Sequence, residues 1–367
     1  HVKGCRSDDY DSHHREVLMK AMVLTEIRGM ELIEVLDPPI RNPGDVRIRM
    51  EAVGVCGSDI HYYVSGRIGS QVVEYPFTVG HECAGTVVET GPSVQSLRPG
   101  DRVAVEPAIT CGECDQCRAG RSNTCRKNRF LGCPGQVEGS LSEFIVMPEQ
   151  NCFPIRNRTS FEDATLSEPL AIGVYAIKKS IPLAGASVGI LGMGPIGTCI
   201  LLPALTMEPK GIYCTDRIDA RLDHAKMSGA TWTANPDRDD VPTAIREHAP
   251  QGLDVVFECC GEQDAIDQSI ELLKPGGKLM LIGIPSADRI SFQIDKMRRK
   301  EITLYNVRRQ EGCVQDALDL IESGAVDAGQ MITHRFSFEE TSKAFDLVAS
   351  YGDGVLKAMI AFEGHAG

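Results

Sequence analysis

The chain has 367 residues, of which 42% are apolar, and a formal net charge of −13 at pH 7. This length suits two domains, and the acidic balance argues against nucleic acid or an anionic membrane as a partner. No stretch approaches 18 uninterrupted apolar residues, and the charged residues near the start argue against a secretory signal. The 14 cysteines, several of them clustered, indicate metal binding in a reducing cytoplasm rather than disulfides.

The first part of the chain is predicted to be rich in β-strands. Residues 1–19 are mostly polar, and we expect a disordered tail there. From residue 20 to about 155, short apolar runs are broken by proline and glycine, and Asp45–Gly54 alternates with period two as a half-buried strand does. Strand after strand with little helical periodicity indicates a barrel-like β domain.

Two short motifs in this part carry metal donors. The first is Val-Gly-Val-Cys56-Gly-Ser58-Asp59-Ile-His61-Tyr62. The second is Gly80-His81-Glu82-x-x-Gly85-x5-Gly91-x-x-Val94. Cys56, His81 and Glu82 offer a thiolate, an imidazole and a carboxylate, which are normal zinc donors. Three protein ligands leave the fourth tetrahedral position to water or an alcohol, so we predict a catalytic zinc.

The second motif resembles the signature of the zinc-containing medium-chain dehydrogenases, and the first resembles their sorbitol (polyol) dehydrogenase branch. The resemblance extends from about residue 20 to about 362. It implies a GroES-like catalytic domain over 20–172, a Rossmann domain over 173–307 and a return to the catalytic domain over 308–367. It also implies a homodimer or homotetramer that acts on a small molecule.

A second set of metal donors has the spacing C-x2-C-x2-C-x7-C and consists of Cys111, Cys114, Cys117 and Cys125. Four thiolates can enclose one tetrahedral zinc and leave no open position, so we predict a second, structural zinc. Disulfides would need an oxidising compartment, which nothing in the sequence indicates. Some polyol dehydrogenases have lost this lobe, whereas this sequence keeps all four cysteines.

Residues 165–180 are predicted to form a helix that is entered through Glu168 and Pro169, because proline suits the first helical turn. A carboxylate at this place is explained by the positive end of the helix alone. The resemblance implies more, namely that Glu168 lies by the catalytic zinc, bound to it directly or through water. Whether Glu82 or Glu168 is the third ligand therefore stays open.

From about residue 186 the pattern changes to alternating strands and helices. The strand Ser187–Leu191 is followed by Gly192-Met-Gly194-Pro195-Ile196-Gly197 and an apolar helix. This order is the context of dinucleotide binding, in which the glycines allow a tight turn, approach of the pyrophosphate and close packing of the helix. The α/β units that follow predict a doubly wound parallel sheet with ligands at the carboxyl ends of its strands.

The predicted cofactor is NAD. Asp216 ends the next strand, where a carboxylate can hydrogen-bond both ribose hydroxyls and would repel the 2′-phosphate of NADP. Arg217 and Arg221 keep the alternative open, because arginines can accept that phosphate, although the resemblance gives Arg221 a ribose or adenine contact. Further cofactor contacts are assigned to Ile282, Gly283, Ile284, Val307 and Arg308.

An open zinc and a nicotinamide together indicate hydride transfer from a secondary alcohol to NAD. Ser58 and His61 lie two and five residues after Cys56, and we expect a relay that takes the hydroxyl proton through Ser58 and the cofactor ribose to His61 and water. Without the resemblance, Ser58 reads equally well as a turn cap and His61 as a surface histidine.

The resemblance places Tyr62, Glu168 and Arg309 against a polyol substrate. Arg308 and Gln310 flank Arg309 here, where aromatic residues are usual, so a sugar acid or sugar phosphate held by two arginines stays an alternative. A non-catalytic NAD or redox sensor and a zinc-free quinone reductase are disfavoured, because both metal sets are complete.

Overall fold

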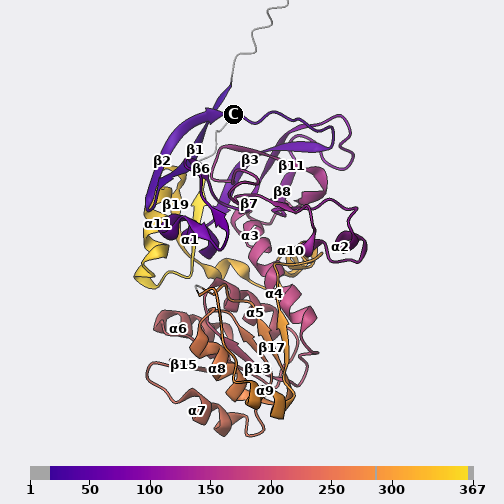
Figure 1. The fold of residues 1–367 in the computed structure, drawn as a ribbon. Helices are drawn as coiled ribbons and strands as arrows, with labels where there is room; N and C mark the ends of the chain where they lie inside the picture. Colours follow the sequence, from indigo (N-terminus) through magenta and orange to yellow (C-terminus); the bar gives the residue numbers. More distant parts are fainter. Residues whose placement is uncertain (1–16, 286, 363–367) are drawn as a thin grey trace, which may run out of the picture.

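The computed structural model describes residues 17–285 and 287–362, which form two lobes joined by a helical layer (Figure 1). Residues 1–16, most of the predicted tail, lie outside this part. Strand β1 (Leu18–Glu26) begins inside the tail that we expected, so the assignment of Leu18 and Met19 was wrong. Both pair with strand β2 (Gly29–Leu36), and Met19 is buried, which explains why they are ordered as a strand.

The first lobe consists largely of antiparallel strands. One sheet has the order β2-β1-β6, with β6 at Phe77–Thr78. The main sheet has the order β12-β8-β7-β3-β20-β19, with β11 also paired to β3. Its strands are β3 (Asp45–Gly54), β7 (Glu82–Thr90), β8 (Arg102–Val105), β11 (Phe144–Pro148), β12 (Cys152–Pro154), β19 (Ile332–Ser337) and β20 (Lys357–Ala361). Two short pairs complete it: β4 (Arg67–Ile68) with β5 (Gln71–Val72), and β9 (Ala108–Ile109) with β10 (Arg129–Phe130).

Strand β3 is central to this sheet. The alternation predicted for it is confirmed, because Val46, Ile48 and Met50 are buried while the arginines between them are partly exposed. One edge of β3 pairs with β7, which carries the second zinc motif. At its carboxyl end β3 also pairs with β20, from the far end of the described chain. This last pairing brings Lys357 beside the residues that follow β3.

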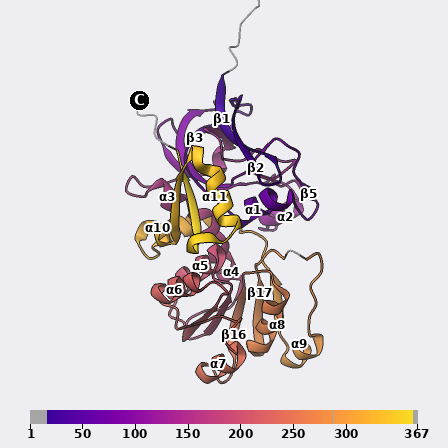
Figure 2. The same ribbon diagram turned by 90° about the vertical axis from the view of Figure 1, so that its left-hand side faces the viewer.

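The second lobe is an all-parallel sheet in the order β15-β14-β13-β16-β17-β18. Its strands are β13 (Ser187–Leu191), β14 (Gly211–Thr215), β15 (Trp232–Ala234), β16 (Leu253–Glu258), β17 (Leu273–Leu281) and β18 (Thr303–Asn306). The helices of this lobe are α5 (Pro195–Leu205), α6 (Asp219–Ser228), α7 (Val241–His248), α8 (Gln263–Leu272) and α9 (Ile294–Lys300) (Figure 2). The predicted α/β fold class, a β-rich domain with a Rossmann sheet, is confirmed.

Helix α4 (Ser167–Lys179) lies between the lobes and packs against α5 and α10 (Val314–Ser323) (Figure 1). It crosses the predicted boundary at 172, and the domain boundaries stay predictions. The remaining helices are α1 (Gly57–Ser65), α2 (Asp115–Arg118), α3 (Phe161–Thr165) and α11 (Thr341–Ala349). Of the helices described, none has both the length and the apolar character needed to cross a bilayer.

Candidate active site and cysteine lobe

The three donors of the predicted catalytic zinc site come together from two elements. Cys56 is the N-cap of α1, His81 immediately precedes β7, and Glu82 is the first residue of β7. One donor atom from each lies within 4.8 Å of the other two, and both His81 and Glu82 are buried. A thiolate, an imidazole and a carboxylate converging at this spacing fit a zinc ion with one position left open.

Asp59 orients two of these donors, a role that we did not predict. As the third residue of α1, it accepts a hydrogen bond from the backbone N–H of Cys56 at 3.2 Å. Its other oxygen lies 3.3 Å from Nδ1 of His81. A carboxylate on one ring nitrogen fixes the ring and directs the other nitrogen to a metal. The available signal was an acid three residues after the cysteine, in the capping position of a helix.

Besides being a predicted zinc donor, Glu82 forms an ion pair with Lys357, the first residue of β20. The Lys357 Nζ donates to both carboxylate oxygens of Glu82, at 2.6 and 2.9 Å, and to the Val55 carbonyl at 3.2 Å. Both side chains are 1% exposed, so this is a fully buried ion pair. The sequence showed only a lysine at the start of an apolar strand, and its partner 275 residues away was not predictable.

Glu168 lies beside this site but outside the group of three donors. It is buried in the first turn of α4, and burial raises its pKa to about 7, with the Glu82 carboxylate adding to the rise and His81 opposing it. The choice between Glu82 and Glu168 as the third ligand stays a proposal.

The predicted proton-relay residues both lie on α1. The Ser58 hydroxyl donates to the Cys56 sulfur at 3.4 Å, which places it next to the metal donors. His61 is one turn further along and half-buried, and burial lowers its pKa. The two residues therefore follow one another along the helix that begins at Cys56.

Arg309, one of the predicted substrate residues, packs on Phe130, which sequence reasoning missed. The Arg309 guanidinium carbon lies 3.5 Å from the centre of the Phe130 ring, and that ring is 5.3 Å from the His81 ring. Tyr62 is buried, and its hydroxyl donates to Gln71 at 3.2 Å. Arg308 is exposed, so the two adjacent arginines lie in different surroundings.

Glu106, also missed, adds a partly buried carboxyl group that acts on Arg309. Burial raises the pKa of Glu106 to about 8, with Glu168 adding to the rise and Arg309 opposing it. Burial and the neighbouring Arg308 lower the pKa of Arg309 to about 10, while Glu168 and Glu106 oppose that shift. Two carboxyl groups thus act on the pKa of Arg309.

The glycine motif forms the turn between β13 and α5. Gly192 has φ +95°, a left-handed conformation that favours glycine, and a Cβ on Gly197 would lie 1.9 Å from the Gly192 carbonyl oxygen. Gly194 is the N-cap and Pro195 the first residue of α5, followed by Ile196. The helix N-terminus is therefore close to the backbone of the turn, as pyrophosphate binding requires.

Asp216 follows β14 and closes this turn from the side. Its carboxylate accepts hydrogen bonds from the backbone N–H groups of Met193 at 2.7 Å and Ile218 at 2.8 Å. The Arg221 Nη1 lies 4.0 Å from Asp216, and its buried Nε has no hydrogen-bond partner in the described part of the chain. Arg217 is exposed and forms an ion pair with Asp237 instead. This arrangement fits a ribose better than a 2′-phosphate.

The other predicted cofactor residues follow the carboxyl ends of neighbouring strands. Ile282, Gly283 and Ile284 come directly after β17, and Val307 and Arg308 directly after β18. These strand ends lie on the same edge of the sheet as the glycine turn, because all strands are parallel. Such an edge is where open α/β sheets bind their ligands.

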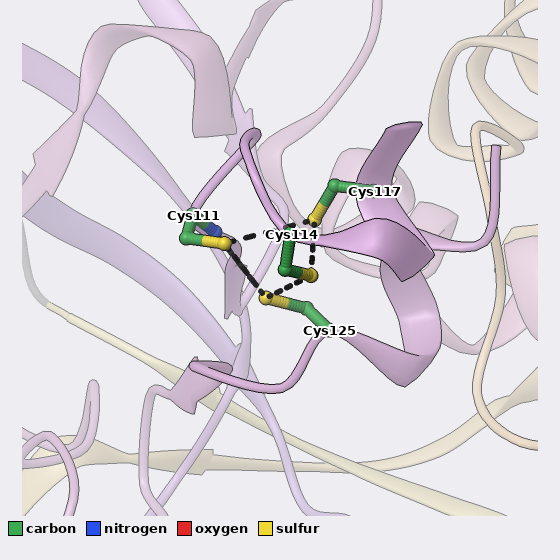
Figure 3. A group of neighbouring side chains, drawn as sticks. All are labelled: Cys111, Cys114, Cys117 and Cys125. Carbon is green, nitrogen blue, oxygen red and sulfur yellow. Dashed lines mark hydrogen bonds between the residues drawn. The ribbon is translucent and has the colours of Figure 1, made fainter. Parts of the chain in front are cut away.

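Cys111, Cys114, Cys117 and Cys125 form a compact cluster beyond β9 (Figure 3). Four of their sulfur–sulfur distances lie between 3.5 and 4.0 Å. Sulfurs at about 2.3 Å from a central zinc form a tetrahedron with edges of about 3.8 Å, so the cluster fits this ion. The described cysteines are free thiols. Hydrogen bonds from the backbone N–H groups of Arg126 and Cys117 lower the pKa of Cys114 to about 6.

An open zinc-donor set in one lobe and a dinucleotide turn in the other are the parts of a metal- and nicotinamide-dependent dehydrogenase. Comparisons with known proteins agree. Residues 42–157 match the family model of the alcohol dehydrogenase GroES-like domain, and residues 195–323 match that of zinc-binding dehydrogenases.

Similar proteins cover nearly the whole chain. Sorbitol dehydrogenase of Bacillus subtilis (strain 168) is 36% identical over 93% of this chain and 97% of its own. L-idonate 5-dehydrogenase of Vitis vinifera is 33% identical over 96% of this chain and 98% of its own. The crystal structure of L-idonate 5-dehydrogenase from Escherichia coli K-12 has a TM-score of 0.87 at 26% identity and covers 94% of this chain and 99% of its own.

The chain therefore belongs to the zinc-containing medium-chain dehydrogenases, in their sorbitol (polyol) dehydrogenase branch. It is a zinc- and NAD-dependent oxidoreductase that acts on small polyols or sugar acids.

Proposed function

We propose that the substrate is a neutral polyol with a vicinal diol, and that one secondary hydroxyl is oxidised to a ketone with reduction of NAD. The observation that supports this choice is the position of Arg309 over the Phe130 ring beside His81, where the Glu168 and Glu106 carboxyl groups are close enough to act on its pKa. The carboxylate of a sugar acid would compete with Glu168 for the same arginine. A polyol hydroxyl can accept from Arg309 and donate to Glu168, so it needs no further positive charge.

In this proposal Cys56, His81 and Glu82 hold the catalytic zinc, which supplies Lewis acidity that makes the substrate hydroxyl more acidic. The dinucleotide, held by the glycine turn and Asp216, supplies the hydride acceptor. Ser58 takes the proton that the hydroxyl loses, and His61 passes it to water. His61 suits this step because its lowered pKa keeps the imidazole neutral and able to accept a proton at neutral pH.

A panel of polyols, matched aldonates and sugar phosphates tests the proposal, with formation of the reduced nicotinamide followed by absorbance. We expect kcat/KM to be at least about tenfold higher for a polyol than for the aldonate of the same configuration, a difference of about 1.4 kcal/mol. Faster oxidation of the aldonate would assign the substrate to the sugar acids.

We also propose NAD rather than NADP as the preferred cofactor. The Asp216→Ala variant should lower kcat/KM with NAD and reduce the preference for NAD by about 10- to 100-fold, because the ribose loses a charged acceptor worth about 1.5–3 kcal/mol. A wild type that turns over faster with NADP at equal low concentration would contradict this assignment.

The proposal includes a cytoplasmic homodimer or homotetramer. The acidic, cysteine-rich composition supports the compartment, and β18 at the end of the parallel sheet offers an edge for a second copy. Light scattering on purified protein gives the number of subunits.

A further inference from the structure

Arg309 has an unusual backbone. Its φ is +50°, in the left-handed region that residues other than glycine rarely adopt. Such a conformation costs about 1–3 kcal/mol and persists only where the surroundings enforce it. Its Nη1 is also buried without a hydrogen-bond partner in residues 17–285 and 287–362. The strain and the free donor both indicate that this side chain is held in place for a ligand.

The residues on both sides of Arg309 are fixed by hydrogen bonds to the first lobe. The Arg308 carbonyl accepts from the Asn123 side chain at 2.9 Å. The Gln310 amide donates to Glu106. One oxygen of the Glu311 carboxylate accepts from the Ser122 hydroxyl at 2.6 Å and from the Asn123 backbone N–H at 2.8 Å.

Two of these partners belong to the cysteine lobe. Ser122 and Asn123 lie in a short 3₁₀ turn, Ser122–Thr124, between Cys117 and Cys125. The Cys125 backbone N–H donates to the Ser122 carbonyl at 2.8 Å, so the turn is bonded directly to a zinc donor. The position of the turn therefore depends on the geometry of the four cysteines.

We propose that Glu311 is a positioning residue through which the cysteine lobe holds Arg309 against the substrate. The lobe then contributes to substrate binding as well as to folding, although none of its cysteines lies in the catalytic group. The inference goes beyond the proposed function but uses polyol oxidation as one of its two readouts.

The test compares three single variants and one double variant. Glu311→Ala removes the acceptor of both hydrogen bonds, whereas Glu311→Gln keeps an acceptor oxygen and removes only the charge. Asp316→Asn is the matched control, because Asp316 is an acid five residues further along whose ion pair with Lys178 at 2.7 Å does not involve the lobe. The double variant adds Cys114→Ser to Glu311→Ala and is compared with Cys114→Ser alone.

We expect Glu311→Ala to raise KM for the polyol by about 5- to 50-fold, the range for a lost hydrogen bond to a charged group, with kcat within about twofold. Glu311→Gln should show a smaller rise and Asp316→Asn none. Cys114→Ser should raise KM similarly, and the double variant should not exceed the larger single effect, because both changes break one connection.

Hydrogen exchange gives the readout that does not depend on turnover. In Glu311→Ala the backbone amides of residues 306–313 should exchange faster, while zinc content stays at the wild-type value. Unchanged exchange and unchanged KM in Glu311→Ala would overturn the proposal, as would additive effects in the double variant. If the wild type does not oxidise polyols, the proposed function fails, and hydrogen exchange still tests the connection to Arg309.

Discussion

The two metal-donor regions differ in how the chain assembles them. The cysteine lobe takes four like donors from 15 consecutive residues, three of them partly exposed. The catalytic group takes three unlike donors from α1 and β7, and it is completed by a lysine from β20. The lobe is thus a local structure, whereas the catalytic group exists only once β3, β7 and β20 have paired.

This difference has an energetic consequence. Thiolates in the lobe are stabilised by backbone N–H groups of the same loop and remain close to water. The Glu82 carboxylate is buried with Lys357, and a buried charge without its partner is costly. We therefore expect the lobe to contribute mainly to stability. In the catalytic group, we expect the loss of one partner of a buried charged pair to destabilise the fold.

The largest effect should come from removing a donor of the catalytic group. His81→Ala should lower kcat by at least about 10⁴-fold, or about 5.5 kcal/mol, because the Lewis acid is lost. Elemental analysis should find two zinc ions per subunit in the wild type and one in the variant.

Cys114→Ser removes a donor of the cysteine lobe instead, and we expect it to affect stability more than catalysis. It should also retain one zinc ion but lose stability, because a structural zinc contributes its binding free energy to folding. Its kcat should stay within about threefold of wild type. A wild type with a single zinc ion, or a Cys114→Ser variant as inactive as His81→Ala, would remove the distinction between the regions.

Lys357→Met tests the long-range part of the catalytic group. In the zinc-free protein it leaves Glu82 buried without a counter-charge, and we expect a loss of about 3–5 kcal/mol in the free energy of unfolding. Glu82→Gln combined with Lys357→Met should recover much of this loss, because both charges are then absent. Denaturant unfolding of the single and the double variant measures the loss and its recovery. Equal destabilisation of both variants would show that the lysine acts by packing alone.

What the sequence could predict follows the same division. The cysteine spacing and the glycine turn are each contained in one short segment, so neighbouring residues determine their geometry. Cys56, His81 and Glu82 were found as motifs, and the structure brings them together. Asp216 was found because its distance from the turn is set by one βα unit.

The residues that were missed act across long separations. Lys357, Phe130 and Glu106 carry no local motif, and each reaches the site through sheet pairing or packing that the sequence does not specify. Leu18 and Met19 were misassigned for the same reason, since their strand is defined by its partner β2. Asp59 lay within a recognised motif, but its bond to His81 depends on the position of β7.

Asp59→Asn should weaken zinc binding at the catalytic group and leave zinc binding at the cysteine lobe unchanged. The amide keeps a shape suited to capping α1 but loses the charge that orients His81, and such changes typically lower metal affinity by about 10- to 100-fold. Competition with a zinc chelator should show weaker binding of the catalytic zinc and unchanged binding of the lobe zinc. Equal weakening at both sites would indicate general destabilisation instead.

The smallest effect concerns Glu106, which links the two regions. It lies between β8 and the short strand β9 that leads to the lobe, and it also contacts Gln310. Burial raises its pKa in the folded protein from 4.5 to about 8. Between these values the folded state binds a proton that the unfolded state has lost, so stability falls as pH rises through this window.

Each unit of pH inside the window corresponds to at most about 1.4 kcal/mol, so we expect a loss of about 1–3 kcal/mol between pH 6 and pH 8 from this group. Glu106→Gln has no proton to lose and should gain stability relative to wild type by that amount over the same range. Glu149→Gln is the control, because hydrogen bonds from Ser96 lower the pKa of that exposed carboxylate and it stays ionised across the range. Urea unfolding at the two pH values measures the difference. If the stability of Glu106→Gln relative to wild type is the same at both, Glu106 is already ionised at pH 6 and acts on Arg309 as a negative charge.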